Sequence, residues 1–154
     1  MKNKLLIILM IFAGAMTLTA PSEILVNDIR DVNGIIYYRD ETVPFTGKIK
    51  DIKDRNYYLN GKPHGKWITF HPSGAMKSIE NWENGKLNGK FVLYYENGTK
   101  IMETTYLNGE DNGKYILYHP NGKIQIKGQI STGKPYGLWE FYDENGTLTR
   151  KQNL

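Results

Sequence analysis

Short alternating segments of apolar and polar residues, separated by glycine-containing turns, occupy the chain from about residue 57 to its end. Residues 89–95 are rich in β-branched and aromatic side chains, which favours an extended strand. The segment Glu96-Asn97-Gly98-Thr99 then reverses the chain, because Asn-Gly readily adopts the positive φ that a hairpin turn needs. A return strand ends at about Tyr106, and Asn108-Gly109 leads into the next hairpin.

This strand-turn-strand unit repeats with a period of 24 residues. Three series of glycines share the period, and each series has four members. The first series is Gly61, Gly85, Gly109 and Gly133; the second is Gly65, Gly89, Gly113 and Gly137; the third is Gly74, Gly98, Gly122 and Gly146. Three series with one period indicate tandem repeats in which each unit stacks against its neighbours.

Aromatic side chains follow the same register. One stands two positions after the second glycine of each unit, and another follows three positions later. The two series are Trp67, Phe91, Tyr115 and Trp139, and Phe70, Tyr94, Tyr118 and Tyr142. The sequence therefore predicts an all-β fold, an elongated antiparallel sheet of tandem 24-residue β-hairpins, roughly 40 Å long at about 4.8 Å per strand.

Full repeats are expected at about residues 57–80, 81–104, 105–128 and 129–154. Phe45-Thr46-Gly47 resembles the start of another unit, but Gly47 lies only 18 residues before Gly65, and the Asn-Gly turn is missing from Asp51 to Arg55. A degenerate first repeat at about 33–56, acting as a cap and preceded by a strand at Ile35 to Tyr38, explains this pattern. At the far end, Arg150, Lys151 and Gln152 are expected to protect an edge strand.

Alternation within the strands predicts which side chains share a face. The face of Trp67 and its equivalents also carries Thr69, Leu93, Leu117 and Phe141, and we expect it to be the buried one. The opposite face carries Lys66, Lys90, Lys114 and Leu138, followed by Ile68, Val92, Ile116 and Glu140. Its mixed character predicts a face exposed to solvent or to a ligand.

The first twenty residues differ from the rest. Met1 to Lys4 is basic, and Leu5 to Phe12 is an unbroken apolar run of eight residues, a pattern typical of a bacterial export signal. We interpret residues 1–20 as a signal peptide and residues 21–154 as the repeat domain. The predicted location is therefore the periplasm, the cell surface or the medium.

The cleavage point and the fate of this segment stay open. Ala13 and Ala15 allow cleavage after Ala15, which is more favourable than a cut after Ala20, because Leu18 is bulky. The alternative is an uncleaved membrane anchor, although the sixteen residues from Leu5 to Ala20 fall short of the ~17 to 25 that span a bilayer.

Net charge and cysteine content restrict the classes of partner and of chemistry that the sequence indicates. Without residues 1–15 the chain has 18 basic and 16 acidic residues, and a net charge of +2 does not indicate nucleic-acid binding. The chain contains no cysteine, which excludes disulfides, thiol chemistry and a lipid-modified N-terminal cysteine. No cofactor is indicated.

The segment from Tyr106 to Lys123, Tyr-Leu-Asn-Gly-Glu-Asp-Asn-Gly-Lys-Tyr-Ile-Leu-Tyr-His-Pro-Asn-Gly-Lys, resembles MORN repeats in their bacterial variant form. The resemblance covers roughly residues 33–154, and the same repeats define proteins labelled as antitoxins of the YwqK family. It implies a fold of hairpin repeats and a role in protein contact, dimerisation or attachment to membrane lipids. It does not imply an enzyme.

A row of lysines is the strongest candidate for a functional site. Stacked repeats would place Lys66, Lys90 and Lys114 at intervals of roughly 10 Å beside Phe70, Tyr94 and Tyr118. Cations beside aromatic rings suit an anionic headgroup, a glycan or an acidic protein partner. The alternative interpretation is a solvated face whose lysines prevent further association of the sheet.

Catalytic and metal sites are not indicated. His71 and His119 occupy the same repeat position, but two periods would separate them by roughly 20 Å, too far for a shared metal ion. None of the four serines lies in a strand-turn-helix elbow, and no pair of carboxylates recurs in facing positions. We therefore expect no enzymatic activity, and a hydrolase of surface polymers is disfavoured.

The function expected from the sequence is that of an exported, non-enzymatic repeat scaffold. Its partner would be a protein or an anionic surface or lipid ligand, bound by repeated weak contacts along one face. The alternative is an antitoxin-like protein that neutralises one toxin by tight binding. A homodimer through the end strands is also compatible with the sequence.

Overall fold

The computed structural model describes residues 22–50 and 54–154, so the predicted signal peptide at residues 1–20 lies outside the described part of the chain. Strands dominate this part, and its one helical element is a short 3-10 turn, η1 (Val26–Asp28). The strands before the first full hairpin are β1 (Glu23–Leu25), β2 (Ile29–Val32), β3 (Ile35–Tyr38), β4 (Gly47–Lys50), β5 (Arg55–Leu59) and β6 (Lys62–Pro63).

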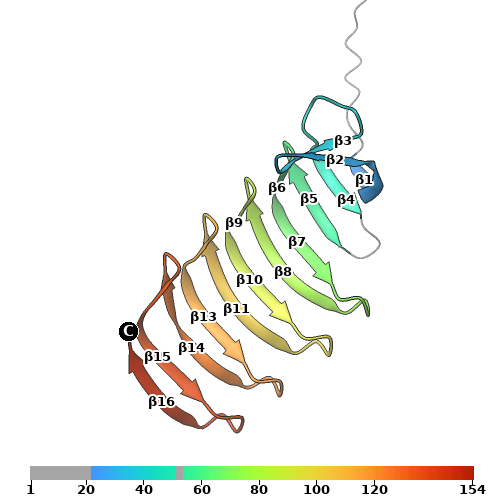
Figure 1. Cartoon of the computed structure of the whole chain (residues 1–154). Helices are drawn as coiled ribbons and strands as arrows, with labels where there is room; N and C mark the ends of the chain where they lie inside the picture. The colour runs from blue at the N-terminus through green and yellow to red at the C-terminus, as the bar shows by residue number, and fades with distance from the viewer. Residues whose placement is uncertain (1–21, 51–53) are drawn as a thin grey trace, which may run out of the picture.

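Four hairpins of similar length follow, as Figure 1 shows. They are β7 (Gly65–Phe70) with β8 (Met76–Glu83), β10 (Gly89–Tyr94) with β11 (Lys100–Leu107), β13 (Gly113–Tyr118) with β14 (Ile124–Ser131), and β15 (Lys134–Tyr142) with β16 (Leu148–Asn153). The short strands β9 (Lys86–Leu87) and β12 (Glu110–Asp111) lie between them and pair with β8 and β11.

The hairpins lie side by side in chain order and form one elongated sheet (Figure 1). Its order is β1-β4-β5-β7-β8-β10-β11-β13-β14-β15-β16, and neighbouring strands are antiparallel except for β1 and β4. The prediction of an all-β, elongated antiparallel sheet of successive hairpins is confirmed.

Two kinds of turn close each repeat, and they use glycine differently. In the turns between repeats, both central residues have positive φ, as at Asn84 (51°) and Gly85 (82°), which is the two-residue geometry that matches strand twist. At the hairpin tip that contains Asn97, only Gly98 has positive φ (82°), so the positive φ expected of this Asn-Gly turn comes from the glycine alone. The tip is instead closed by the Gly98 N–H, which donates to the Tyr95 carbonyl at 3.0 Å.

The turns between repeats also bond to one another. The Gly85 N–H donates to the Pro63 carbonyl at 2.9 Å, and the Gly109 N–H donates to the Leu87 carbonyl at 2.8 Å. The Gly133 N–H completes the series at the Asp111 carbonyl, at 2.9 Å. Each turn is therefore anchored to the turn before it, which fixes the stacking of successive repeats.

A distinct cap covers the N-terminal end of the sheet. In the region predicted to be a degenerate first repeat, β4 pairs with β5 in antiparallel orientation, and β1 adds a parallel strand beside β4. The predicted strand at Ile35 to Tyr38 exists as β3, but it pairs with β2 in a separate two-stranded sheet. Buried side chains of Ile24, Ile36, Phe45 and Ile49 join these pieces in one core cluster.

Burial in the repeats contradicts the expected division into a buried and a solvated face. Val92 and Ile116 are only 3% and 8% exposed, although they lie on the face predicted to be solvated. On the opposite face Trp139 is buried, whereas Trp67, Phe91 and Tyr115 are half-buried. The reason is that one layer of strands leaves both faces open, so each residue is covered only by its neighbours on adjacent strands.

Candidate functional site: the lysine face

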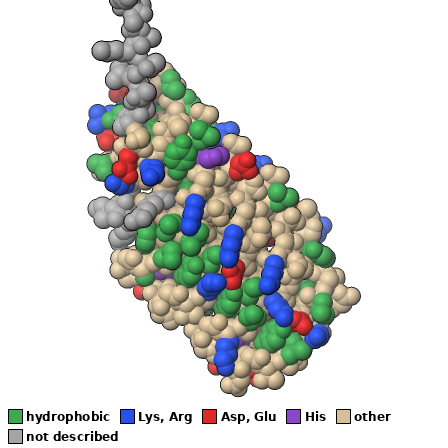
Figure 2. All heavy atoms as spheres, turned by 180° about the vertical axis from the view of Figure 1, so that it is seen from behind, with side chains coloured by type: hydrophobic (Ala, Val, Ile, Leu, Met, Phe, Trp, Pro, Cys, Tyr) green, Lys and Arg blue, Asp and Glu red, His purple; other side chains and the backbone are tan. Residues whose placement is uncertain are grey.

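The face of the sheet that carries Lys66, Lys90 and Lys114 is called the lysine face below. These residues occupy the second position of β7, β10 and β13, and all three are exposed. Figure 2 shows this side of the molecule, with Lys and Arg side chains in a row across the strands and acidic side chains among them. The structure therefore brings the three predicted lysines into one register on one face.

Lys90 is part of an ion-pair cluster. Its Nζ lies 2.9 Å from Glu103 Oε2, Lys100 Nζ lies 3.1 Å from Glu103 Oε1, and the Tyr118 hydroxyl donates to Glu103. Burial raises the pKa of the Glu103 carboxyl, but the hydrogen bonds from Lys90, Tyr118 and Lys100 outweigh it and lower the pKa to about 2. Glu103 therefore stays ionised, and Lys90 is not a free cation as the sequence alone implied.

A second cluster with the same chemistry lies on β14, β15 and β16. Lys127 Nζ and Lys151 Nζ lie 2.7 Å and 3.1 Å from the two oxygens of Glu140, and the Tyr142 hydroxyl donates to Glu140 at 2.9 Å. Hydrogen bonds from Lys127, Lys151 and Tyr142 lower the pKa of the Glu140 carboxyl to about 2. Each cluster combines two lysines with one carboxylate, so each keeps a net charge of +1.

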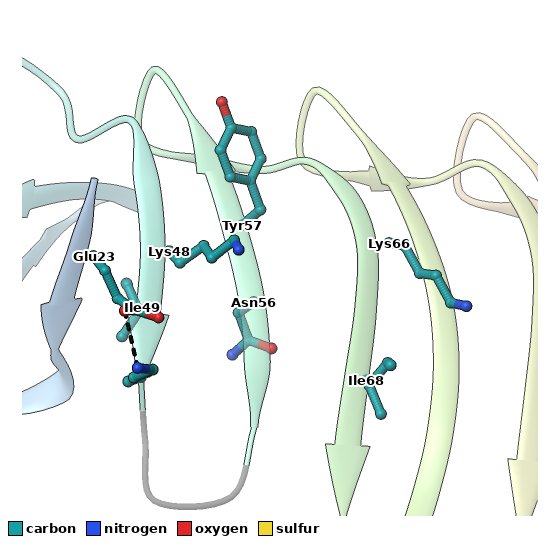
Figure 3. A pocket seen from close by; sticks show the side chains of 8 residues that line it. Glu23, Lys48, Ile49, Asn56, Tyr57, Lys66 and Ile68 are labelled. Carbon is teal, nitrogen blue, oxygen red and sulfur yellow. Dashed lines mark ion pairs between the residues drawn. The ribbon is translucent and has the colours of Figure 1, made fainter.

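Lys66 and Lys114 differ from Lys90, because neither has an ion-pair partner among the described residues. Each lines a shallow depression in the lysine face. Lys66 lines one of about 420 Å³ between β4, β5 and β7, together with Lys48, Tyr57 and Ile68 (Figure 3). Lys114 lines one of about 290 Å³ together with Lys90, Glu103, Thr105 and Ile116. Each depression combines lysines with an apolar side chain and one carboxylate, Glu23 in the first and Glu103 in the second.

The predicted aromatic partners Phe70, Tyr94 and Tyr118 lie at the far ends of the same strands as the lysines. Tyr118 contacts the charged cluster, since Lys100 Nζ lies 5.7 Å from its ring centroid and its hydroxyl donates to Glu103. Burial, the bond to Glu103 and its charge raise the Tyr118 pKa above the ordinary range of tyrosine. The Tyr118 hydroxyl therefore positions Glu103, and its hydrogen is donated within the protein.

The opposite face carries a row of mutually packed aromatic rings and is called the aromatic face below. Ring centroids lie 5.1 Å apart for Tyr58 and Trp67 and 5.3 Å apart for Trp67 and Trp82, in tilted geometry. Further along, Phe91 packs on Tyr106 at 5.7 Å and Tyr115 on Trp139 at 5.8 Å. Rings that pack against each other across strands stabilise the sheet.

His71 and His119 have structural partners. Nε2 of His71 lies 2.9 Å from the Tyr94 carbonyl, and Nε2 of His119 lies 2.9 Å from the Tyr142 carbonyl. Each imidazole therefore joins its hairpin tip to the following repeat. Within the described residues no group of three or more His, Asp or Glu side chains has the geometry to hold a metal ion. No helix in this part of the chain has the length and apolar character needed to span a bilayer.

One further set of residues on the lysine face was not predicted from the sequence. Asn81, Thr105 and Gln129 are also spaced by 24 residues, and they lie directly opposite Lys66, Lys90 and Lys114 in the sheet. Their common period was visible in the sequence. Their pairing with the lysines was not, because it depends on the register of each hairpin.

Comparison with known proteins identifies a family to which the repeats are similar. A family model described as "MORN repeat variant" matches residues 63–84, 87–108, 111–130 and 135–154. No curated protein sequence matches the chain. Among solved structures, a similar one is that of a point mutant of S. aureus TarM in complex with Fondaparinux, alpha-GlcNAc-glycerol and UDP. The two chains are 12% identical with a TM-score of 0.39, and the match covers 58% of this chain and 18% of that one.

Proposed function

Because the chain belongs to the MORN repeat variant family, we propose that it is an exported, non-enzymatic scaffold that binds an anionic partner through the lysine face. The repeats make it a binding scaffold built from equivalent positions. The observation that carries the choice of face is the register of Lys66, Lys90 and Lys114 on alternate hairpin strands. Repeated weak contacts at such positions combine into useful affinity when one partner spans them.

Electrostatics supports an anionic partner. Lys66 and Lys114 have no ion-pair partner among the described residues, and the cluster of Lys90, Lys100 and Glu103 keeps a net positive charge. The partner is a protein or a surface or lipid ligand that carries negative charge.

Export is the second part of the proposal. The basic start at Met1 to Lys4 and the apolar run from Leu5 to Phe12 support it, and they favour the periplasm, the cell surface or the medium as the location of the scaffold. An uncleaved segment would hold the repeats at the membrane. In either case the partner is expected outside the cytoplasm.

The test compares two triple variants of the full chain. One replaces Lys66, Lys90 and Lys114 by Gln, and the matched control replaces the exposed Lys62, Lys86 and Lys134, which lie next to the turns between repeats. Both lose three positive charges and keep the same N-terminal segment. Binding is measured to vesicles that contain phosphatidylglycerol and to an extract of the cell surface.

We expect the first variant to lose binding about tenfold more than the control, since each exposed ion pair contributes a few-fold. Equal losses in the two variants would show that net charge alone decides, and would contradict a specific role for the lysine face. Cell fractionation tests the location. Retention in the cytoplasm with tight binding to a toxin would support the antitoxin alternative and overturn export.

A further inference from the structure

We propose that the ligand of the lysine face is an extended linear polyanion with one negative charge per structural repeat, such as an acidic polysaccharide with a carboxylate on every second sugar. This inference rests on the proposed function, because it names the ligand of the same face. It follows from a row of side chains that crosses the strands and from the net positive charge of the face on which that row lies.

The row consists of lysines that alternate with neutral hydrogen-bonding residues on successive strands, and is called the polar row below. Its members on β7, β8, β10, β11, β13 and β14 are Lys66, Asn81, Lys90, Thr105, Lys114 and Gln129.

The strand registers place these residues in line. Within hairpins, Lys66 lies opposite Asn81, Lys90 opposite Thr105 and Lys114 opposite Gln129. Between hairpins, the pairing of Val92 with Ile79 sets Lys90 beside Asn81. The pairing of Glu103 with Ile116 likewise sets Thr105 beside Lys114.

The spacing of the row follows from sheet geometry. Adjacent strands lie about 4.8 Å apart, so lysines on every second hydrogen-bonded strand repeat at about 10 Å. Five of the six members are exposed, and Asn81 is half-buried. Figure 2 shows the corresponding line of Lys and Arg side chains across this face. The polar row is therefore an accessible track with a fixed period along the sheet.

The acidic groups beside the row leave the net charge of the lysine face positive. Glu103 pairs with Lys90 and Lys100, and Glu140 pairs with Lys127 and Lys151. Each carboxylate therefore neutralises only one of its two lysines. Lys66 and Lys114 add one charge each without an ion-pair partner among the described residues. Counted over these groups, the lysine face carries a net charge of +1 on each of the first two full hairpins, +2 on β13–β14 and 0 on β15–β16, an average of one per hairpin. That average matches a polyanion with one charge per repeating unit.

The period distinguishes this ligand from an acidic peptide. Side chains on one side of an extended peptide recur every two residues, or about 6.8 Å, which falls out of step with lysines at about 10 Å. A polysaccharide charged on every second sugar has a longer repeat, close to that of the hairpins. Thr105, between Lys90 and Lys114, and Gln129, beyond Lys114 at the end of the row, supply a hydroxyl and an amide to hydrogen-bond sugar hydroxyls.

The alternation also distinguishes the ligand from a lipid bilayer. Headgroups move laterally and can match cations in any arrangement, so a bilayer would gain nothing from lysines held at a fixed spacing. Three lysines would also bind an anionic membrane only weakly, since each one near the surface contributes little by itself. A polymer with a fixed repeat can match the spacing of the lysines and can form hydrogen bonds with the neutral residues of the polar row.

The experiment measures the affinity of the full chain for hyaluronan oligosaccharides of increasing length, which carry one carboxylate on every second sugar. We expect affinity to rise with length up to roughly three disaccharides, one for each lysine, and then to level off. The K66Q/K90Q/K114Q variant should bind about tenfold or more weakly, and the K62Q/K86Q/K134Q control should bind like the wild type. A T105V/Q129A variant, unchanged in charge, should lose affinity several-fold because it removes hydrogen bonds to the sugar.

Poly-L-glutamate and phosphatidylglycerol vesicles distinguish this inference from the proposed function. Lysine-dependent binding to either probe without binding to hyaluronan would overturn the polysaccharide and leave the proposed function standing. Equal affinity for hyaluronan and polyglutamate would contradict a match between the spacing of the lysines and the spacing of charges on the ligand. Absence of lysine-dependent binding to all three probes would overturn both. Full affinity of T105V/Q129A for hyaluronan would overturn the role of the neutral positions.

Discussion

Nε2 of His119 lies 2.9 Å from the backbone carbonyl of Tyr142, which belongs to the next hairpin along the sheet. The contact joins residues 23 positions apart, and His71 makes the same contact to Tyr94 two repeats earlier. These imidazoles hold neighbouring hairpin tips together, while the turn glycines hold the opposite ends together.

Replacement of His119 by Ala should destabilise the protein by about 1–3 kcal/mol, because it leaves the Tyr142 carbonyl without its donor. His119 is 8% exposed, whereas the His71 side chain is 18% exposed, so His71→Ala should cost less. Urea unfolding, followed by tryptophan fluorescence, measures the loss of stability in both variants. Unfolding midpoints that equal that of the wild type would show that these contacts do not tie the repeats together.

The turn glycines offer two substitutions in one repeat register with different outcomes. A Cβ on Gly61 would come within 2.6 Å of Ile35 Cγ2 and 2.7 Å of the Ile36 carbonyl oxygen, whereas a Cβ on Gly133 would meet nothing within 4 Å. Gly133→Ala should therefore cost only the left-handed backbone strain, about 1–2 kcal/mol. Gly61→Ala should cost about 3 kcal/mol or more, because it also displaces the cap.

The comparison of Gly61→Ala with Gly133→Ala is made by urea unfolding of both variants under the same conditions. Equal losses would contradict the close packing of the cap strand β3 against the first turn.

Gly128 supports the indole of Trp139. A Cβ at Gly128 would overlap Trp139 Cδ2 and Cε2, so Gly128→Ala must displace the ring. We expect a loss of about 1–3 kcal/mol and a red shift of tryptophan emission as the buried indole becomes exposed. The Gly128→Ala change should cost much less in a Trp139→Leu background. A double-mutant cycle with no coupling energy would contradict the contact.

Acid should destabilise the repeats through Glu103 and Glu140. The folded-state pKa of each carboxyl is about 2, below the ordinary 4.5, so the unfolded chain binds protons first as the pH falls. Their contribution to stability is therefore complete above about pH 4.5 and is lost as the pH decreases towards 2. Unfolding midpoints measured across this window should fall steeply for the wild type.

The Glu103→Gln variant should show a shallower fall over the same window, and Glu103→Gln with Glu140→Gln a shallower one still. The midpoint at neutral pH reports whether each variant folds. A double variant with the acid dependence of the wild type would exclude these carboxylates as its source.

Much of this molecule follows from local pattern. The hairpins, their period and the positions of their turns depend on residues close together in sequence, such as Asn84 and Gly85, whose φ preferences act within one turn. The alignment of Lys66, Lys90 and Lys114 on one face also follows, because alternation along a strand and a constant period determine it. These features need no knowledge of distant contacts.

The ion pairs and the distribution of burial required the tertiary structure. Lys90 and Glu103 meet because β10 pairs with β11 in one register, and a shift of one residue would place the carboxylate on the other face. The burial of Val92, on the face expected to be solvated, depends on its neighbours on both adjacent strands.

The sequence by itself thus determined the repeating hairpin, since backbone preference and side-chain alternation act over a few residues. The cap strand β1, the lysine clusters around Glu103 and Glu140, and the bonds from His71 and His119 were decided only in three dimensions. Each of these depends on the pairing of strands from different parts of the chain, and the free energy of that pairing belongs to the whole sheet.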